Sequence, residues 1–595
     1  MSDFIIIEPT KFIQNTHVII RFMPRNRITD ILIYIVLIVV LLTPRISKID
    51  SFVTLDEPSW LSQGANFYYA VAQREFENTV YEYQPAVTTM WIIAFGMLVY
   101  FPEYRALEQG YLNYEKGILD PFMIEHGQDP LVLLTYARVI QVFIILILFL
   151  VLYYLLQRLV SKPIALFTVL FASFDPFHLG QSRLLDHEAM LSLFVMISIF
   201  ALAIYLSQGR RFIFLILSGI AAGFAQLTKS SAIAILVPIG ILMLMQIIQE
   251  RKEGLTKTII DNSNTFAIWI FSLVVTYFIF WPGMWVAPGK MLYEVYGNAF
   301  SYAFQGARLT VTEELDVAQF DLGKLSGIWE VAKVLVYRMT PFTWLGVLLG
   351  FAIPFTRDRE LVRSYRQLFT LLVTTAIAFI FMIGIAQGRN SPHYILTSYL
   401  ALNLLAGLGW FHFIKWLAGF FASIRIQQMQ YAAMFLLLIL QIWSAASFFP
   451  YYFTYQNPLY FETGKDRDFP QFAYGEGLEL AAQYLATLPN AKDLTVLSYY
   501  GRGCFSYFYP GQTIAFRPFW VDGEHAEDLL RVVQSADYLV IYNANQGQLE
   551  KYSAYLNILS TVEPVHEVWL DGMKYVIIYQ VDELPASVFE ALSDL

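Results

Sequence analysis

The sequence contains little charge and almost no cysteine. Of the 595 residues, 15% are charged, whereas soluble domains contain roughly a quarter, so an ordinary water-soluble enzyme is disfavoured. Its one cysteine, Cys504, excludes an internal disulfide and a cysteine-rich metal site. The formal net charge of −9 argues against a nucleic-acid partner, because nucleic-acid binding needs a basic patch.

Hydrophobic residues make up 57% of the chain, and many of them lie in long apolar runs. A bilayer core of about 30 Å is crossed by about 20 apolar residues in a helix. The opening residues are not interpreted as a cleavable signal peptide, because no small-residue cleavage site follows the first apolar run. We predict an α-helical polytopic membrane protein with about eleven transmembrane helices, at roughly 28–46, 131–157, 163–179, 187–206, 212–228, 231–249, 265–282, 341–356, 367–386, 394–418 and 431–449.

The stretch 86–101 (AVTTMWIIAFGMLVYF) is apolar but short for a span. Basic residues concentrate on the cytoplasmic side of membrane proteins, which allows the two possibilities to be compared. If 86–101 lies along the membrane surface, all the basic clusters fall on one side. These clusters are Arg21, Arg25 and Arg27; Arg158 and Lys162; Arg210 and Arg211; Arg251, Lys252 and Lys257; Arg357, Arg359, Arg363 and Arg366; and Lys415 and Arg425. We therefore predict a surface helix, a cytoplasmic amino terminus and an extracytoplasmic carboxyl terminus in the cell membrane.

The predicted spans divide the chain into three parts. Residues 1–27 form a cytoplasmic segment, 28–449 the membrane module, and 450–595 an extracytoplasmic tail. Within the module, two large extracytoplasmic loops cover 47–130 and 283–340.

The tail is predicted to be a small soluble α/β domain. Residues 475–488 have helical spacing, 494–499 and 537–542 are strand-like, and 563–570 with 573–581 resemble a hairpin joined by Asp571-Gly572. The tail contains no glycine-rich nucleotide-binding loop, so nucleotide binding is not expected.

Ionisable residues gather at the predicted outer side. Asp56 and Glu57 follow the first span, and Arg138 lies about two helical turns inside the second. A cation at that depth needs an anionic partner unless its side chain reaches the membrane interface. Asp56 has an alternative interpretation as a helix N-cap before Pro58. The other members of this group are Arg183, Asp186, His187, Glu188, Lys229, Arg389 and His393. Cations and carboxylates at one leaflet predict a site for an anionic lipid headgroup.

Four motifs, in this order, resemble a known family. They are Asp56-Glu57, QPAVTTMW (84–91), Tyr136-Ala137-Arg138 and SRLLDHEAML (182–191). The chain thereby resembles glycosyltransferase family 39, which contains the protein O-mannosyltransferases, is related to the aminoarabinose transferases of lipid A, and belongs to the GT-C superfamily. Two tail motifs, Tyr455-Gln456-Asn457-Pro458-Leu459 and Gly475-Glu476-Gly477-Leu478, look like those of bacterial relatives.

The resemblance implies transfer of a sugar, such as the hexose mannose, from a polyprenyl-phosphate donor to an acceptor hydroxyl on the outer side, with inversion. The acceptor is a protein, a glycan or a glycolipid. The resemblance implies Asp56 as general base, with Glu57 beside it as a second catalytic carboxylate or as a group that orients the acceptor or tethers the cations. The donor phosphate would meet Arg138, Lys229, Arg389 and His393. Arg183, Asp186 and Gln84 would orient the acceptor or the cations.

Gln84-Pro85 departs from the family, in which His-Pro or Lys-Pro is usual, and this leaves the identity of the donor open. No cofactor is expected. The alternative is a divalent metal at Asp186-His187-Glu188, but neighbouring residues on a helix point in different directions. A secondary transporter or a lipid-carrier flippase without transfer chemistry remains the alternative function.

Overall fold

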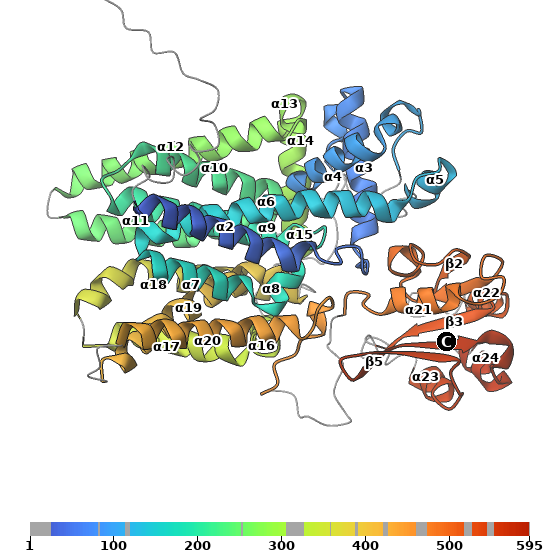
Figure 1. Ribbon diagram of the computed structural model, residues 1–595. Coiled ribbons are helices and arrows are strands. Elements are labelled where there is room, and N and C mark those ends of the chain that lie inside the picture. Colours follow the sequence, from blue (N-terminus) through green and yellow to red (C-terminus); the bar gives the residue numbers. More distant parts are fainter. Residues whose placement is uncertain are drawn as a thin grey trace, which may run out of the picture.

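The computed structural model contains a long helical bundle and a smaller mixed domain at one end of it (Figure 1). It describes residues 25–80, 84–112, 119–251, 254–304, 326–357, 359–386, 391–420, 426–459, 473–516, 526–543 and 553–593. Most of the predicted cytoplasmic segment 1–27 lies outside these ranges. The expected architecture, a polytopic helical protein with a small α/β domain, is confirmed.

Each of the eleven segments predicted as spans contains a helix of the bundle. These helices are α2 (Arg25–Ile46), α6 (Pro130–Leu159), α7 (Lys162–Ser173), α9 (Glu188–Ser207), α10 (Phe212–Thr228), α11 (Leu236–Glu250), α12 (Leu255–Phe280), α17 (Pro341–Ala352), α18 (Arg359–Gly384), α19 (Leu396–Ala418) and α20 (Ile426–Ala446). In the described part of the chain, 8 helical segments are long and apolar enough to cross a membrane, or 9 if a bent pair counts as one span. The number of crossings therefore stays a prediction.

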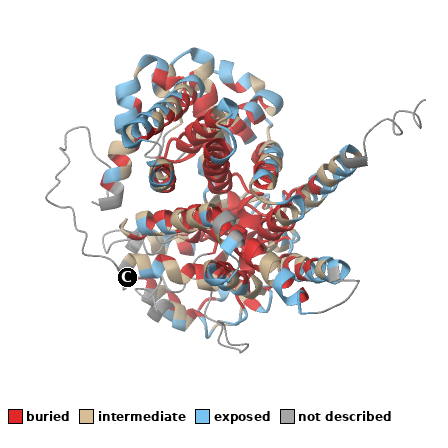
Figure 2. Cartoon of the chain, turned by 90° about the vertical axis from the view of Figure 1, so that its left-hand side faces the viewer, coloured by how far each residue is buried: buried red, intermediate tan, exposed pale blue. Residues whose placement is uncertain are grey.

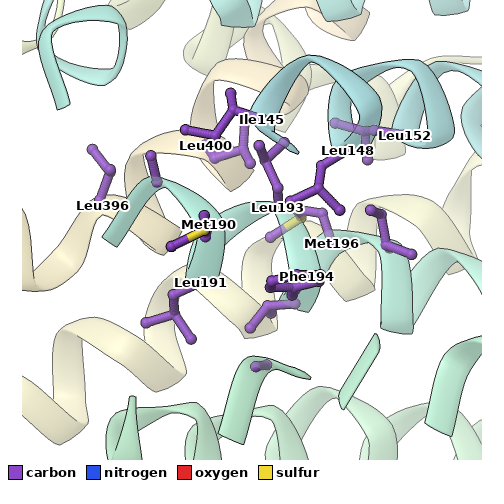
Figure 3. Packing of buried hydrophobic residues seen from close by; sticks show 14 of the residues in the cluster. Ile145, Leu148, Leu152, Met190, Leu191, Leu193, Phe194, Met196, Leu396 and Leu400 are labelled. Carbon is purple, nitrogen blue, oxygen red and sulfur yellow. The ribbon is translucent and has the colours of Figure 1, made fainter. Parts of the chain in front are cut away.

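Helix α9 forms the centre of the bundle. Its apolar window is 100% buried, whereas that of α2 is 11% buried and belongs to the outside of the bundle. Side chains of α9 interdigitate with those of α6 and α19, as Met190, Leu193 and Leu400 illustrate (Figure 3). Viewed along the bundle, buried residues gather at the centre and exposed ones at the rim (Figure 2). A helix that is apolar all round is expected in such a central position.

Side-chain contacts fix which helix ends lie together. At one end, Lys162 at the start of α7 pairs with Asp30 in α2 (2.6 Å), and Arg210 before α10 pairs with Glu250 at the end of α11 (2.8 Å). The connections 47–130 and 283–340 leave from the opposite end of the bundle, where the mixed domain also lies (Figure 1). The short connections at one end of the bundle and the long ones at the other agree with the predicted order in which the helices cross the membrane.

Helix α4 (Val87–Tyr100) lies across the end of the bundle that faces the mixed domain. Near its start, the Thr88 hydroxyl donates a hydrogen bond to the Thr228 hydroxyl at the end of α10 (3.0 Å). One turn later, the indole N–H of Trp91 donates to the carbonyl of Phe280 at the end of α12 (2.8 Å). At its other end, the Tyr100 hydroxyl accepts from Asp129, which caps α6 (2.9 Å). Both ends of α4 thus contact helix termini, as expected for a surface helix.

Short helices surround α4 at the same end. They are α3 (Glu57–Gln73), α5 (Leu119–Glu125), α8 (Pro176–Gln181), α13 (Gly283–Val286), α14 (Pro288–Leu292), α15 (Asn298–Phe304), α16 (Ser326–Arg338) and the 3-10 turn η4 (Ser230–Ile235).

One predicted span differs from the structure. The segment 163–179 is divided between α7 and α8, because Asp175 accepts from the backbone N–H of His178 and Pro176 begins a new helix. The predicted span 341–356 begins where it was expected, after a bend of 117° that separates it from α16, because Thr340 caps α17 and Pro341 begins it. Proline at a first helical position favours a new helix over the continuation of the previous one.

The carboxyl-terminal domain contains a five-stranded sheet in the order β2-β1-β3-β5-β4. Strands β1 and β2 and strands β1 and β3 are parallel, whereas β5 is antiparallel to β3 and β4. The predicted hairpin is present, and Asp571 and Gly572 both have positive φ, as a tight type I′ turn requires. The strands are β1 (Thr495–Ser498), β2 (Gln512–Ala515), β3 (Tyr538–Tyr542), β4 (His566–Leu570) and β5 (Met573–Gln580).

Helices cover both faces of this sheet. Residues of α21 (Leu478–Ala486) pack with Val496 on one face, and residues of α22 (Ala526–Gln534), α23 (Ser553–Leu559) and α24 (Ala586–Ser593) pack with Leu497 on the other. The sequence predicted α21 and four strands but missed β2 and the last three helices, whose apolar patterns are short.

The arrangement predicts that the first loop and the carboxyl-terminal domain are reached from one side of a membrane. We expect Glu125→Cys and Lys492→Cys, both at exposed positions, to react with an impermeant thiol reagent from the same side of sealed vesicles. Ser207→Cys, exposed at the other end of the bundle, is expected to react only from the opposite side. The parent chain is the control, because its Cys504 is buried. Labelling of Glu125→Cys and Lys492→Cys from different sides would contradict the arrangement.

Candidate active site

The turn Leu55-Asp56-Glu57-Pro58 sends two neighbouring carboxylates into different surroundings. Asp56 occupies the N-cap position of α3, but its side chain makes no capping hydrogen bond. Glu57 is 1% exposed, whereas the Asp56 side chain is open to solvent. Asp56 therefore occupies the N-cap position, but its carboxylate does not cap the helix.

Glu57 is held by an ion pair with Arg138. The Arg138 Nε lies 2.7 Å from Oε1 of Glu57, and Nη2 lies 2.5 Å from Oε2. Glu57 also accepts from the N–H and hydroxyl of Thr54 (2.8 and 3.0 Å) and from the N–H of Leu185 (2.8 Å). These bonds join the turn to α6 and to the segment before α9.

Arg138 uses its remaining donors on the first loop. Its guanidinium also bonds the carbonyl of Ile49 and that of Phe52, the latter at 2.9 Å. Because Arg138 is only 1% exposed, its side chain does not reach the interface but is satisfied inside the protein. Glu57 is the partner that a buried Arg138 was predicted to need, and their ion pair directs the Arg138 guanidinium toward the first loop.

Arg183 and Arg45 fix the backbone that leads to the turn. Arg183 is buried and donates to the carbonyls of Ser47 (2.6 Å) and Lys48 (2.5 Å). Arg45, at the end of α2, donates to the Ser182 hydroxyl (2.8 Å) and to the carbonyl of Ser173 (3.0 Å). The sequence did not single out Arg45, although it is a cation at the outer end of a span.

Asp56 lies in an enclosed but solvent-accessible space. Within the described residues its carboxylate makes no hydrogen bond or ion pair, although protein atoms surround it closely. Burial and the negative charges of Asp186 and Glu57 together raise the pKa of Asp56 to about 7, although the Lys229 ammonium opposes them. A carboxylate with this pKa is a much stronger base than one near the ordinary value of about 3.9.

The second group of ionisable residues lies beside Asp56. Asp186 is half-buried, and burial raises its pKa to about 6, while Lys229 and the N–H of His187 (2.7 Å) lower it. Lys229, at the break between α10 and η4, forms a buried ion pair with Oε1 of Glu188. Oε2 of Glu188 is buried and has no hydrogen-bond partner among the described residues.

Aromatic rings form part of this space. The Lys229 ammonium lies 4.3 Å from the ring centre of Tyr394, a distance at which a cation is attracted to a ring face. Trp60 in α3 packs edge-on against His187 at 5.0 Å. Nδ1 of His393 lies 3.1 Å from the hydroxyl of Tyr474, a residue of the carboxyl-terminal part. The structure thus brings Asp56, Asp186, Lys229 and His393 together.

Two predicted site residues are not placed with this group. Arg389 lies outside the described residues. Gln84 is buried just before α4, so its proposed orienting role stays a prediction. Over the described ranges, no three His, Cys, Asp or Glu side chains are arranged to hold a metal ion, including Asp186, His187 and Glu188.

The Glu57–Arg138 pair predicts a large loss of stability when one partner is removed. Glu57→Gln or Arg138→Met leaves a buried charge without its partner, which costs about 3–5 kcal/mol. We expect each single variant to unfold at clearly lower temperature in detergent, and the double variant to lose less than the sum of both.

The matched control for this pair lies on the same helix. Arg158→Met removes an exposed arginine at the other end of α6 and is expected to change the free energy of unfolding by at most about 0.5 kcal/mol. Additive losses in the Glu57 and Arg138 variants would show that the pair is not energetically coupled.

A comparison with known families matches the part of the chain that contains two of the four motifs, 136–138 and 182–191. Residues 133–277 match the family model described as dolichyl-phosphate-mannose-protein mannosyltransferase. This segment contains Arg138, the whole of α9 and Lys229. No curated protein matches the sequence.

Solved structures whose backbone can be aligned with this protein share little sequence identity with it. ArnT from Cupriavidus metallidurans bound to undecaprenyl phosphate has 13% identity and a TM-score of 0.43, covering 92% of this chain and 97% of that one. The oligosaccharyltransferase AglB from Archaeoglobus fulgidus, in complex with an inhibitory peptide and a dolichol-phosphate, has 11% identity and a TM-score of 0.45, covering 90% and 71%. Over residues 133–277 the chain is therefore similar to the dolichyl-phosphate-mannose-protein mannosyltransferases.

Proposed function

We propose that this protein transfers a sugar, a hexose such as mannose, from a polyprenyl-phosphate donor to an acceptor hydroxyl at the end of the bundle that carries Asp56. The observation that carries the proposal is the Asp56 carboxylate, which is accessible, makes no hydrogen bond or ion pair with the described residues, and has a raised pKa beside the buried cation Lys229. The matched family model, described by dolichyl-phosphate-mannose, supports the class of donor.

Asp56 acts as the general base. It takes the proton of the acceptor hydroxyl while the acceptor oxygen attacks the anomeric carbon of the sugar. The bond from that carbon to the phosphate oxygen breaks, and the polyprenyl phosphate leaves with the electron pair. A single displacement inverts the anomeric configuration. Because the pKa of Asp56 is near neutrality, the carboxylate is a competent base at physiological pH.

Lys229 and His393 are the groups that we assign to the donor phosphate. Lys229 uses one of its three N–H donors on Glu188 and retains others for an anion. Arg389 is retained in this role from the sequence. Arg138, which was predicted to meet the phosphate, is now proposed to position the turn, because Glu57 and two loop carbonyls use its donors.

Asp186 is assigned to the acceptor. Its half-buried carboxylate lies near Asp56 and raises the pKa of that residue. The acceptor, a protein, glycan or glycolipid, would approach from the side of the carboxyl-terminal domain. A lipid-carrier flippase with the same lipid-phosphate site needs no general base, and a secondary transporter is expected to bind its substrate near the midplane of the membrane, so the enzyme is the better interpretation.

Replacement of the base tests this function directly. Asp56→Asn is expected to lower transfer about 10²- to 10⁴-fold, as loss of a general base does, in purified protein assayed by mass with polyprenyl-phosphate sugars and a mixed acceptor pool. Asp50→Asn removes an exposed carboxylate from the same loop and is the matched control. Near-parent turnover of Asp56→Asn would remove Asp56 from the role of base.

The stability of Asp56→Asn separates loss of chemistry from loss of fold. The raised pKa means that the folded chain holds the Asp56 proton more tightly than the unfolded chain, so this residue lowers stability as pH rises from about 4 to about 7. The variant is therefore expected to melt at the same or higher temperature than the parent at pH 8.

The pH dependence of transfer is a further test. Because Asp56 must be deprotonated, kcat/KM is expected to rise about tenfold per pH unit below pH 7 and to level off above it. A profile that stays flat from about pH 5 to 8 would contradict a base of this pKa.

A further inference from the structure

The carboxyl-terminal domain and the segment that enters it contact the turn of Asp56 directly. The carbonyl of Tyr474 accepts from the N–H of Leu55 (3.3 Å), the residue before Asp56. A Cβ atom on Gly475 would lie 3.1 Å from the carbonyl oxygen of Val53. The backbone at 474–475 therefore lies against the chain that leads into the turn.

A second segment of the domain contacts the other side of the turn. Arg502 donates through Nη2 to the carbonyl of Pro58 (3.2 Å) and to the hydroxyl of Ser62 (2.8 Å), both in the first turns of α3. Gly503, with φ of +75°, approaches so closely that an added Cβ would lie 2.2 Å from Cγ of Pro58. The two segments contact the residues immediately before and after the Asp56–Glu57 pair.

Asp120 of α5 anchors the second segment. Its two carboxylate oxygens accept from Nε of Arg502 (2.6 Å) and from the hydroxyl of Tyr507 (2.8 Å). Asp120 is 6% exposed, so this charge-assisted contact is shielded from solvent. Arg502 thereby joins three elements: the domain, the beginning of α3 and α5.

We propose that the carboxyl-terminal domain is a structural part of the active site, in which Arg502 and Gly503 position the turn that carries Asp56. The inference rests on the proposed function for its effect on transfer, but the docking itself can be measured without any reaction. An appended acceptor-binding module would have no need of contacts with the backbone on both sides of a catalytic residue.

Hydrogen exchange of the full-length protein tests the docking. Arg502→Leu is expected to accelerate exchange in peptides that cover 52–62, because the Pro58 carbonyl and the Ser62 hydroxyl in the first turns of α3 lose the guanidinium that fixes them. Arg531→Leu removes an exposed arginine of the same domain that pairs with Asp528 and is expected to leave this exchange unchanged. Equal exchange in both variants and the parent would overturn the proposal.

A glycine pair provides a second test without a change in charge. Gly503→Ala introduces a Cβ against Pro58, whereas Gly572→Ala, at nearly the same φ of +78°, introduces one with nothing within 4 Å. Both variants place a Cβ at positive φ, but only Gly503→Ala places it against Pro58, so faster exchange confined to 52–62 reports the contact with the turn. We expect faster exchange at 52–62 only in Gly503→Ala, and equal behaviour of the two variants would count against the contact.

Kinetics show whether docking supports the chemistry. Arg502→Leu is expected to lower kcat by about tenfold or more and to leave the donor KM within about twofold, because a small misplacement of a reacting group slows the reaction step. Arg502→Lys keeps the ion pair and is expected to recover part of the rate. Faster exchange with unchanged kcat would refute the positioning role, whereas absence of transfer in the parent would refute the proposed function alone.

Discussion

The buried ion pair between Glu57 and Arg138 is the constraint on which the rest of the site depends. It connects the first loop to α6, and through Leu185 it also connects the loop to the segment before α9, the central helix of the bundle. Removing two charges from water is costly, and the cost is offset only if the partners are fully bonded. That requirement fixes the turn, and with the turn fixed the neighbouring Asp56 must face the space beside Asp186 and Lys229.

Much of the fold could be predicted because its physical origin is visible along the chain. Apolar runs of membrane length located the helices, whereas the surface position of 86–101, inferred from the basic residues between them, stays a prediction. The break at Pro176 was missed because the apolar run continues through it, and a run alone does not show where a helix bends. Strand β2 escaped notice because a four-residue edge strand has too few residues for a period to be visible.

The sequence predicted which ionisable residues would lie close together, whereas their roles in the site stay predictions. Charge at one leaflet was enough to gather Asp56, Asp186, Lys229 and His393, because ionisable groups near a membrane are rarely placed there without a function. The sequence could not show that Arg138 is directed to Glu57, or that the surroundings of Asp56 raise its pKa. Both depend on contacts between residues far apart in the chain. Arg502 and Asp120 were invisible for the same reason, since 382 positions separate them.

The opposite orientations of Asp56 and Glu57 have a consequence for how this segment can vary. Aspartate and glutamate differ by one methylene group, so an exchange of one for the other at either position alters the chemistry of the carboxylate only modestly. An insertion or deletion of a single residue between Thr54 and Pro58 would instead exchange their positions, and the wrong carboxylate would be sealed in the interior. The number of residues in this turn is therefore as strictly limited as their identity, and relatives should differ here by substitution and keep the same spacing.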